Sequence, residues 1–108
     1  MTWTVETLNE VVDKELEALP ADTRARFVRI VQLIEALGLP DLGLPHVRHL
    51  KGPLWEMRMR GRAGIARAIY VAASNKRVVV VRVFIKKTQT TPQREIDLAL
   101  DRAQEVLK

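Results

Sequence analysis

The sequence predicts a single α+β domain over residues 1–108, in which an N-terminal helical hairpin packs on a small antiparallel β-sheet and a C-terminal helix closes the structure. Three patterns support this fold class. Residues 77–87 (RVVVVRVFIKK) are a nearly unbroken β-branched run, and apolar residues recur at helical spacing over residues 22–37 and 96–107. A chain of 108 residues with 47% hydrophobic content is large enough to bury one core.

The run at residues 77–87 predicts the central strand of the sheet. Side chains alternate across a strand, so we expect one wholly apolar face and a second face that includes cations. The first face holds Val79, Val81, Val83 and Ile85, and the second holds Val78, Val80, Arg82, Phe84 and Lys86. Burying an unpaired arginine is costly. The first face is therefore expected to build the core, and the second to open to solvent or to an anionic ligand.

The N-terminal third predicts a short strand and two helices. Residues 2–6 alternate as a strand, and Thr7 and Glu10 have the spacing of a capping box that opens the first helix. That helix ends at Pro20, and the second helix runs from about residue 22 to Gly38. The residues expected to face inward are Trp3, Val5, Val11, Val12, Leu16, Leu19, Phe27, Ile30, Val31, Ile34 and Leu37. The two helices should form a hairpin that covers one face of the sheet.

The remainder predicts a loop, a three-stranded meander and a closing helix. Residues 41–52 (DLGLPHVRHLKG) are rich in Gly and Pro and predict an ordered loop. Residues 54–60 alternate between an apolar face and an ionic face, and residues 65–73 follow after a turn. In this second strand Ile65, Arg67, Ile69 and Val71 lie opposite Ala66, Ala68, Tyr70 and Ala72. Ser74–Lys76 predicts the next hairpin, and Thr91 before Pro92 predicts the N-cap of the last helix.

The basic residues are concentrated in the predicted sheet. Residues 46–87 contain eleven Lys or Arg against the single acid Glu56, so this segment carries +10 and the rest of the chain −5. Such a concentrated positive field is typical of a protein that binds a polyanion. A solvated strand surface is the alternative explanation.

One face of the meander should gather most of these charges. If the apolar strand faces turn toward the helical hairpin, the opposite face collects Glu56, Arg58, Arg67, Arg82 and Lys86. Four cations from three adjacent strands would form a shallow groove suited to a phosphodiester backbone. Structural alternatives exist for three of them: Arg58 could pair with Glu56, Arg67 could cover the end of the hairpin, and Arg82 could lie half buried against a carboxylate.

Composition argues against several kinds of site. Cysteine is absent, so disulfides and cysteine-ligated metals are excluded. Two histidines, His46 and His49, and one acid in the basic segment leave a zinc or two-metal site without ligands, so we expect no metal and no other cofactor. A signal-peptide pattern is lacking, and no apolar run approaches the roughly 20 residues of a membrane span. We expect a soluble cytoplasmic protein that does not bind a membrane.

Three stretches of the chain resemble a known toxin family. HLKGPLWEMRMR, GIARAIYV and VFIKKTQTTPQREIDLA, in this order and spacing, resemble the phage-derived HigB-like toxins of the RelE/ParE superfamily. LPADTRARFVRIVQLIEALG is similar to the helical hairpin of that family. The resemblance extends from about Leu19 to the C-terminus, with residues 86–92 as its most specific part. It implies a RelE-like fold.

The resemblance also implies a function and partners. The expected function is that of the toxin in a type II toxin–antitoxin system, a ribosome-dependent mRNA endonuclease. In relatives, cleavage resembles that of metal-free ribonucleases, in which the RNA 2′-hydroxyl attacks the adjacent phosphate. The implied partners are the ribosome, mRNA and a cognate helix-turn-helix antitoxin.

Site residues follow by matching position. The resemblance implies that Arg67 clamps the phosphate, that Arg58 lies near the reacting nucleotide, and that Lys86 and Lys87 form a basic pair at the strand exit. Fixed cations suit this reaction because the pentacovalent transition state carries extra negative charge. Further RNA contacts are expected from Arg60, Arg82, Thr88, Gln89 and Lys51. The general base stays open between His46 or His49, which titrate near neutrality, and catalysis by Lys and Arg charge alone.

Two other functions compete with the nuclease. ParE-like members of the superfamily inhibit DNA gyrase by binding it, and a plain RNA-binding domain would also be basic. The sequence KKTQ at residues 86–89, where the predicted central strand ends, and the cations Arg58, Arg67 and Lys86 favour the nuclease. The five aromatic residues mostly have core positions, which disfavours single-strand binding by base stacking.

Overall fold

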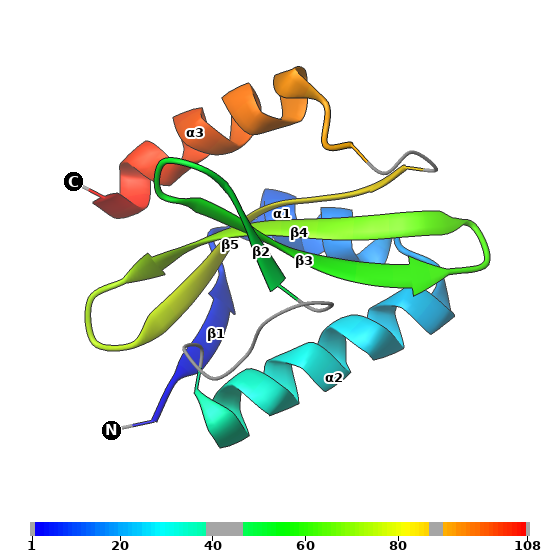
Figure 1. Ribbon diagram of the computed structural model, residues 1–108, viewed down its shortest axis with the longest axis horizontal. Helices are drawn as coiled ribbons and strands as arrows, with labels where there is room; N and C mark the ends of the chain where they lie inside the picture. The colour runs from blue at the N-terminus through cyan, green and yellow to red at the C-terminus, as the bar shows by residue number, and fades with distance from the viewer. Residues whose placement is uncertain (1, 39–46, 87–89, 108) are drawn as a thin grey trace.

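The protein forms three layers, with helices on both sides of a central sheet. The computed structural model describes residues 2–38, 47–86 and 90–107 (Figure 1). The element order is β1 (Thr4–Thr7), α1 (Glu10–Glu17), α2 (Ala21–Leu37), β2 (Val47–Lys51), β3 (Leu54–Gly61), β4 (Gly64–Ala73), β5 (Arg77–Lys86) and α3 (Gln93–Leu107). In Figure 1, α3 lies above the sheet and α2 below it. Among these described helices, none is long and apolar enough to cross a membrane.

The sheet confirms the predicted meander and adds two strands at its edges. Within the described residues the strand order is β1-β5-β4-β3-β2, and β3, β4 and β5 pair antiparallel with short connections. β1 confirms the short strand predicted over residues 2–6, and it pairs parallel with β5 beside the antiparallel strands. β2 pairs antiparallel with β3 inside the segment predicted as a loop. Gly and Pro at the start of that segment masked the strand, whose Val47 is buried in the core. Residues 41–46 of the predicted loop lie outside the described residues.

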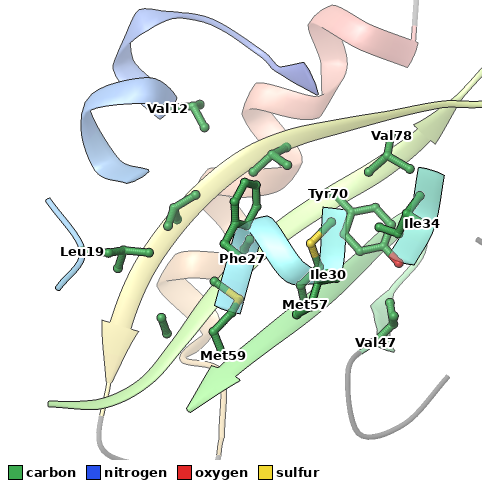
Figure 2. Close-up of a cluster of buried hydrophobic side chains, with 14 residues drawn as sticks. Val12, Leu19, Phe27, Ile30, Ile34, Val47, Met57, Met59, Tyr70 and Val78 are labelled. Atoms are coloured by element: carbon green, nitrogen blue, oxygen red, sulfur yellow. The ribbon is translucent and has the colours of Figure 1, made fainter. Parts of the chain in front are cut away.

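One face of the sheet packs against α1 and α2. Phe27, Ile30 and Ile34 of α2 face the sheet residues Met57 and Tyr70, and Val12 of α1 joins the same cluster (Figure 2). The apolar stripes of β3 and β4 therefore point to the two helices as predicted. The helices follow one another at Pro20, and each covers its own part of the sheet: α1 packs on β5, and α2 on β3 and β1.

The opposite face is partly covered by α3, contrary to the expectation that it would be open. Ala99 and Ala103 of α3 pack with Ile69, Val71 and Val79 in a second apolar cluster. The cause is the central strand itself, because β5 carries apolar side chains on both faces and both must be removed from water. Only the part of this face beyond α3 is left for the ionic residues.

A β-bulge at Val81 changes the face assignments of β5. Ile69 pairs with Arg82 whereas Tyr70 pairs with Val80, so Val81 is the extra residue. Val78 and Val80 consequently lie on the α1/α2 side together with Val83 and Ile85, while Val79, Val81 and Phe84 lie on the α3 side. The strict alternation predicted for residues 77–87 was wrong. A run of four valines contains no signal for the phase change.

Two charged side chains protect the exposed half of the β5 edge. β1 pairs with β5 only as far as Val80, so beyond that residue no strand in the described part of the chain pairs with this edge of β5. There the Val83 N–H donates to Glu15 Oε1 (3.0 Å), and Arg102 Nη1 donates to the Val81 carbonyl (2.9 Å). Glu15 and Arg102 also pair with each other (2.8 Å). Charged residues at a strand edge satisfy its polar groups and prevent pairing with another chain.

The helix ends differ in detail from the prediction. Asn9, not Thr7, caps α1, since its side chain accepts from the Val12 N–H, whereas the Thr7 hydroxyl donates to Asp13. Val11 and Leu37 were expected to face inward, but both are more than half exposed because they fall on the outer sides of their helices. α3 begins at Gln93, and the hydroxyl of the predicted cap Thr91 donates to Glu56 instead.

The β3–β4 turn is fastened to the first turn of α2. A Cβ on Gly61 would lie 2.3 Å from Thr23 Cγ2, so only glycine permits this approach. Asp22 Oδ2 accepts from the Arg62 N–H (3.0 Å), and Asp22 Oδ1 accepts from the Thr23 N–H (2.9 Å). The hydrogen bond from the Arg62 N–H is the main reason that the pKa of Asp22 lies below its ordinary value, and the bond from the Thr23 N–H adds to this effect.

This contact makes stability depend on pH through Asp22. A carboxyl whose pKa is lowered by folding stabilises the protein above its unfolded pKa of about 3.9, and this contribution is lost as pH falls through the folded pKa. Asp22→Asn keeps the shape but not the charge. In urea unfolding, we expect the stability gap between wild type and Asp22→Asn to narrow as pH falls from about 6 to about 3. Asp101→Asn, at an exposed position on α3, is the control. An equal gap at both pH values would contradict this role of Asp22.

Candidate functional site

Strand register brings the predicted ionic residues together on the α3 side of the sheet. Arg58 of β3 lies directly opposite Arg67 of β4, and Glu56 of β3 lies opposite Arg48 of β2. Further along the same face, Ile65 of β4 pairs with Arg60 of β3 on one side and with Lys86 of β5 on the other. The predicted convergence of cations from β3, β4 and β5 on one face is confirmed by these pairings.

Glu56 is the centre of an arginine cluster formed by Arg48, Arg58 and Arg67. Its Oε1 atom lies 3.2 Å from Arg58 Nε and 3.9 Å from Arg48 Nε. Its Oε2 atom lies 3.8 Å from Arg67 Nε and accepts a hydrogen bond from the Thr91 hydroxyl at 2.6 Å. Both carboxylate oxygens are thus engaged from three strands and the segment before α3. The proposed pairing of Arg58 with Glu56 is confirmed.

The side chains of the cluster differ in how far they are exposed to solvent. Arg67 is 0% exposed and Glu56 1%, whereas the side chain of Arg58 is 15% and that of Arg48 48% exposed. The expectation that Arg67 lies on an open face was wrong, because β4 is an interior strand and the Arg67 side chain reaches diagonally to Glu56. Burial, and next the neighbouring Arg58, lower the pKa of Arg67, while Glu56 opposes this effect.

A groove of about 350 Å³ opens beside the cluster. It is lined by residues from three parts of the chain: Arg48, His49 and Leu50 of β2, Glu56 of β3, and Thr90, Thr91 and Ile96 before and within α3. The groove has guanidinium and hydroxyl donors, which suit the oxygens of a phosphate, and two aliphatic side chains. Of the three arginines of the cluster, Arg48 lines the groove and is the most exposed, whereas Arg58 and Arg67 lie behind it.

His49, one of the two candidate bases, is held at the mouth of this groove. Its Nε2 lies 2.8 Å from the Gly52 carbonyl oxygen, and its ring contacts Trp55 edge-on at 4.9 Å. A carbonyl can only accept, so Nε2 carries the proton and a neutral ring presents its lone pair at Nδ1. The geometry permits a role as a base but does not test it.

Arg82 is on the predicted face but belongs to a different network. It makes two hydrogen bonds to Glu95 (2.8 and 3.2 Å) and an ion pair with Glu15 (2.8 Å), and it lies 5.7 Å from the centre of the Phe84 ring. The Glu95 hydrogen bonds are the main cause of the raised pKa of Arg82. Its guanidinium ties α1 and α3 to β5, as the half-buried alternative predicted. Arg82 is therefore part of the framework, and its predicted RNA contact stays a prediction.

The other predicted site residues are not equally placed. Arg60 is exposed and Lys86 half buried, both near the Arg58 end of the cluster. Lys51 is exposed at the β2–β3 turn, at the opposite end of β3 from Arg60. His46, Lys87, Thr88 and Gln89 lie outside the described residues. Their predicted roles stay predictions.

Sequence reasoning missed Glu56 as the organising residue, together with Arg48 and Thr91. The available signal was that Glu56 is the only acid among eleven basic residues in residues 46–87. Arg48 could not be found because its strand was read as a loop. Within the described parts of the chain, no group of three His, Cys, Asp or Glu side chains could hold a metal ion.

The fold is that of RelE toxins. The structure matches a chain of the archaeal RelE–RelB complex from Pyrococcus horikoshii OT3 with a TM-score of 0.58 at 24% identity, over 83% of this chain and 100% of that chain. It also matches a free, double arginine-to-alanine mutant of the E. coli toxin RelE, with a TM-score of 0.58 at 16% identity, over 94% of this chain and 98% of that chain. At these identities the matches establish the fold alone.

The family is established by sequence. The family model described as "Phage derived protein Gp49-like" matches residues 14–104, so the chain belongs to the phage-derived Gp49-like family. No curated protein matches the chain significantly.

Proposed function

We propose that this protein is the toxin of a type II toxin–antitoxin system and acts as a ribosome-dependent mRNA endonuclease. The arginine cluster beside the groove is the observation that carries the proposal. The RelE fold and the Gp49-like family support it, as does the HigB-like resemblance of residues 86–92. Such an enzyme acts in the cytoplasm, where its mRNA substrate is translated.

The chemistry proposed for the site is electrostatic. A phosphate of the mRNA lies in the groove against Arg48, and Arg58 and Arg67, which pair with Glu56 of the groove, add their positive field. When the 2′-hydroxyl attacks the phosphate, negative charge grows on the phosphoryl oxygens. A cation held in a low-dielectric environment stabilises that charge without having to reorient. Arg60 and Lys86 hold the flanking backbone.

Arg67→Met tests this chemistry. Methionine fills a similar space without charge, and loss of one fixed cation should lower mRNA cleavage in a translating extract about 100-fold, or about 3 kcal/mol in the barrier. The fold should persist, because an apolar side chain is acceptable at a fully buried position.

Arg82→Met is the matched control. It removes an arginine of the same face that lies outside the groove, and it leaves Glu95 buried without its bidentate partner. We expect lower thermal stability but nearly unchanged cleavage per folded molecule. Equal cleavage losses in both variants would place the site elsewhere. Growth arrest with intact mRNA and inhibited DNA supercoiling would indicate gyrase inhibition instead.

The ends of the RNA products test the metal-free route. Attack by the 2′-hydroxyl expels the 5′-oxygen and leaves a 2′,3′-cyclic phosphate on one fragment and a 5′-hydroxyl on the other. We expect these ends when a defined mRNA is cleaved on purified ribosomes, as read by end-specific ligation and mass spectrometry. Ribosomes need magnesium, so product ends are more informative than chelation. Fragments with 5′-phosphates would refute the mechanism.

The proposed cellular partner is a cognate antitoxin with a helix-turn-helix DNA-binding domain. If its acidic residues cover the basic face, charge reversal at Arg60 and Lys86 should slow association and flatten its dependence on salt, with less effect on dissociation. Arg29→Glu, on the exposed side of α2, is the control and should change association little. Stopped-flow rates at several ionic strengths provide the measurement. A salt slope altered only by Arg29→Glu would place the antitoxin on α2.

A further inference from the structure

Glu56 presents a physical contradiction if the groove receives a phosphate. It lines the groove, and its carboxylate lies among the cations that would attract RNA. A negative charge at this position repels a phosphodiester and weakens RNA binding. A carboxylate that costs affinity at a binding site needs a compensating role.

The arrangement of the arginines supplies that role. Arg58 and Arg67 are directly opposite each other on adjacent strands, and like charges in such pairs repel. Burial, Arg58 and Arg48 all act to lower the pKa of Arg67, and Glu56 is the group that opposes them. Glu56 therefore supplies the counter-charge that offsets the repulsion between two adjacent guanidinium groups, of which that of Arg67 is buried.

The contacts of Glu56 also fix orientation. One oxygen is shared by Arg58 and Arg48, and the other by Arg67 and the Thr91 hydroxyl. These partners come from β2, β3, β4 and the segment before α3, so a single side chain relates the positions of four parts of the fold. Groups aligned before the reaction stabilise a transition state better than groups that must move.

We propose that Glu56 is a positioning residue of the nuclease, which aligns Arg58 and Arg67 for the transition state at the expense of RNA affinity. This inference rests on the proposed function. The cluster of three arginines and one carboxylate has a net charge of +2. Its design favours turnover over ground-state binding, since only interactions stronger in the transition state accelerate the reaction.

The test is single-turnover cleavage of a defined mRNA on purified programmed ribosomes, with the concentration of the protein varied. Glu56→Gln raises the net charge of the cluster, so the half-saturating concentration should fall about fivefold, because a charge that repels the phosphodiester is removed. The maximal rate should fall about 100-fold, as expected for misaligned groups. A purely structural carboxylate would not move the two parameters in these directions.

Three further variants complete the design. Glu95→Gln, a buried glutamate paired with Arg82 away from the groove, should leave both parameters near wild type. Glu56→Asp keeps the charge but withdraws the carboxylate, so it should lower the maximal rate without tighter binding, even if Glu56→Gln folds poorly. Glu56→Gln combined with Arg48→Gln restores the net charge of +2, and the half-saturating concentration should rise again while the rate stays low.

The outcomes separate this inference from the proposed function. If wild type does not cleave ribosome-bound mRNA, the nuclease proposal itself fails. If wild type cleaves and Glu56→Asp retains the full maximal rate, Glu56 does not position the arginines. If Glu56→Gln and Glu95→Gln change both parameters alike, the carboxylate is only structural and the inference is overturned.

Discussion

The structure depends on the need to cover both faces of β5. Val78 and Val80 point to the α1/α2 side of the sheet. Because of the bulge at Val81, Val83 points to the same side. A strand of this composition requires a helix layer on each face. α1 and α2 cover one face and α3 covers part of the other, and the groove beside Glu56 opens between β2 and the start of α3. The apolar requirement of one strand thus sets both the layer order and the position of the groove.

The bulge has a second consequence at the edge of the sheet. It lies where β1 ends, so within the described residues no strand pairs with this edge of β5 beyond Val80, and the Val83 N–H and the Val81 carbonyl are bound by Glu15 and Arg102. Arg82, which follows the bulge, pairs with Glu15 as well and with Glu95 of α3. Charged residues that are scattered along the sequence therefore form one network, and this network attaches α1 and α3 to the sheet. This explains why one of the predicted RNA-binding arginines serves the framework.

The sequence predicted the elements whose pattern is regular and missed those that depend on contacts between distant residues. Period-two alternation located β3 and β4 and assigned their faces, and helical spacing located α2 and α3. The phase change at Val81 left no trace in a run of identical residues, and β2 was hidden by the Gly and Pro before it. The convergence of Arg58 and Arg67 was predicted from alternation, but their depth was not. Depth depends on how β4 is enclosed, which no local pattern reports.

The positive charge of the central segment includes cations with different physical roles. Exposed residues such as Arg60 and Lys51 act through water, where salt screens them over about 8 Å, so in the proposed function they would steer the RNA and bind it loosely. Arg58 and Arg67 act at short range in a poorly solvated environment, where charge is stronger and costs more to maintain. That cost gives a physical reason for the single acid of the segment, because Glu56 places a counter-charge beside the buried Arg67 and its neighbour Arg58. The number of basic residues thus indicates that a polyanion can bind. The position of Glu56 indicates which of these cations are suited to the proposed cleavage of RNA.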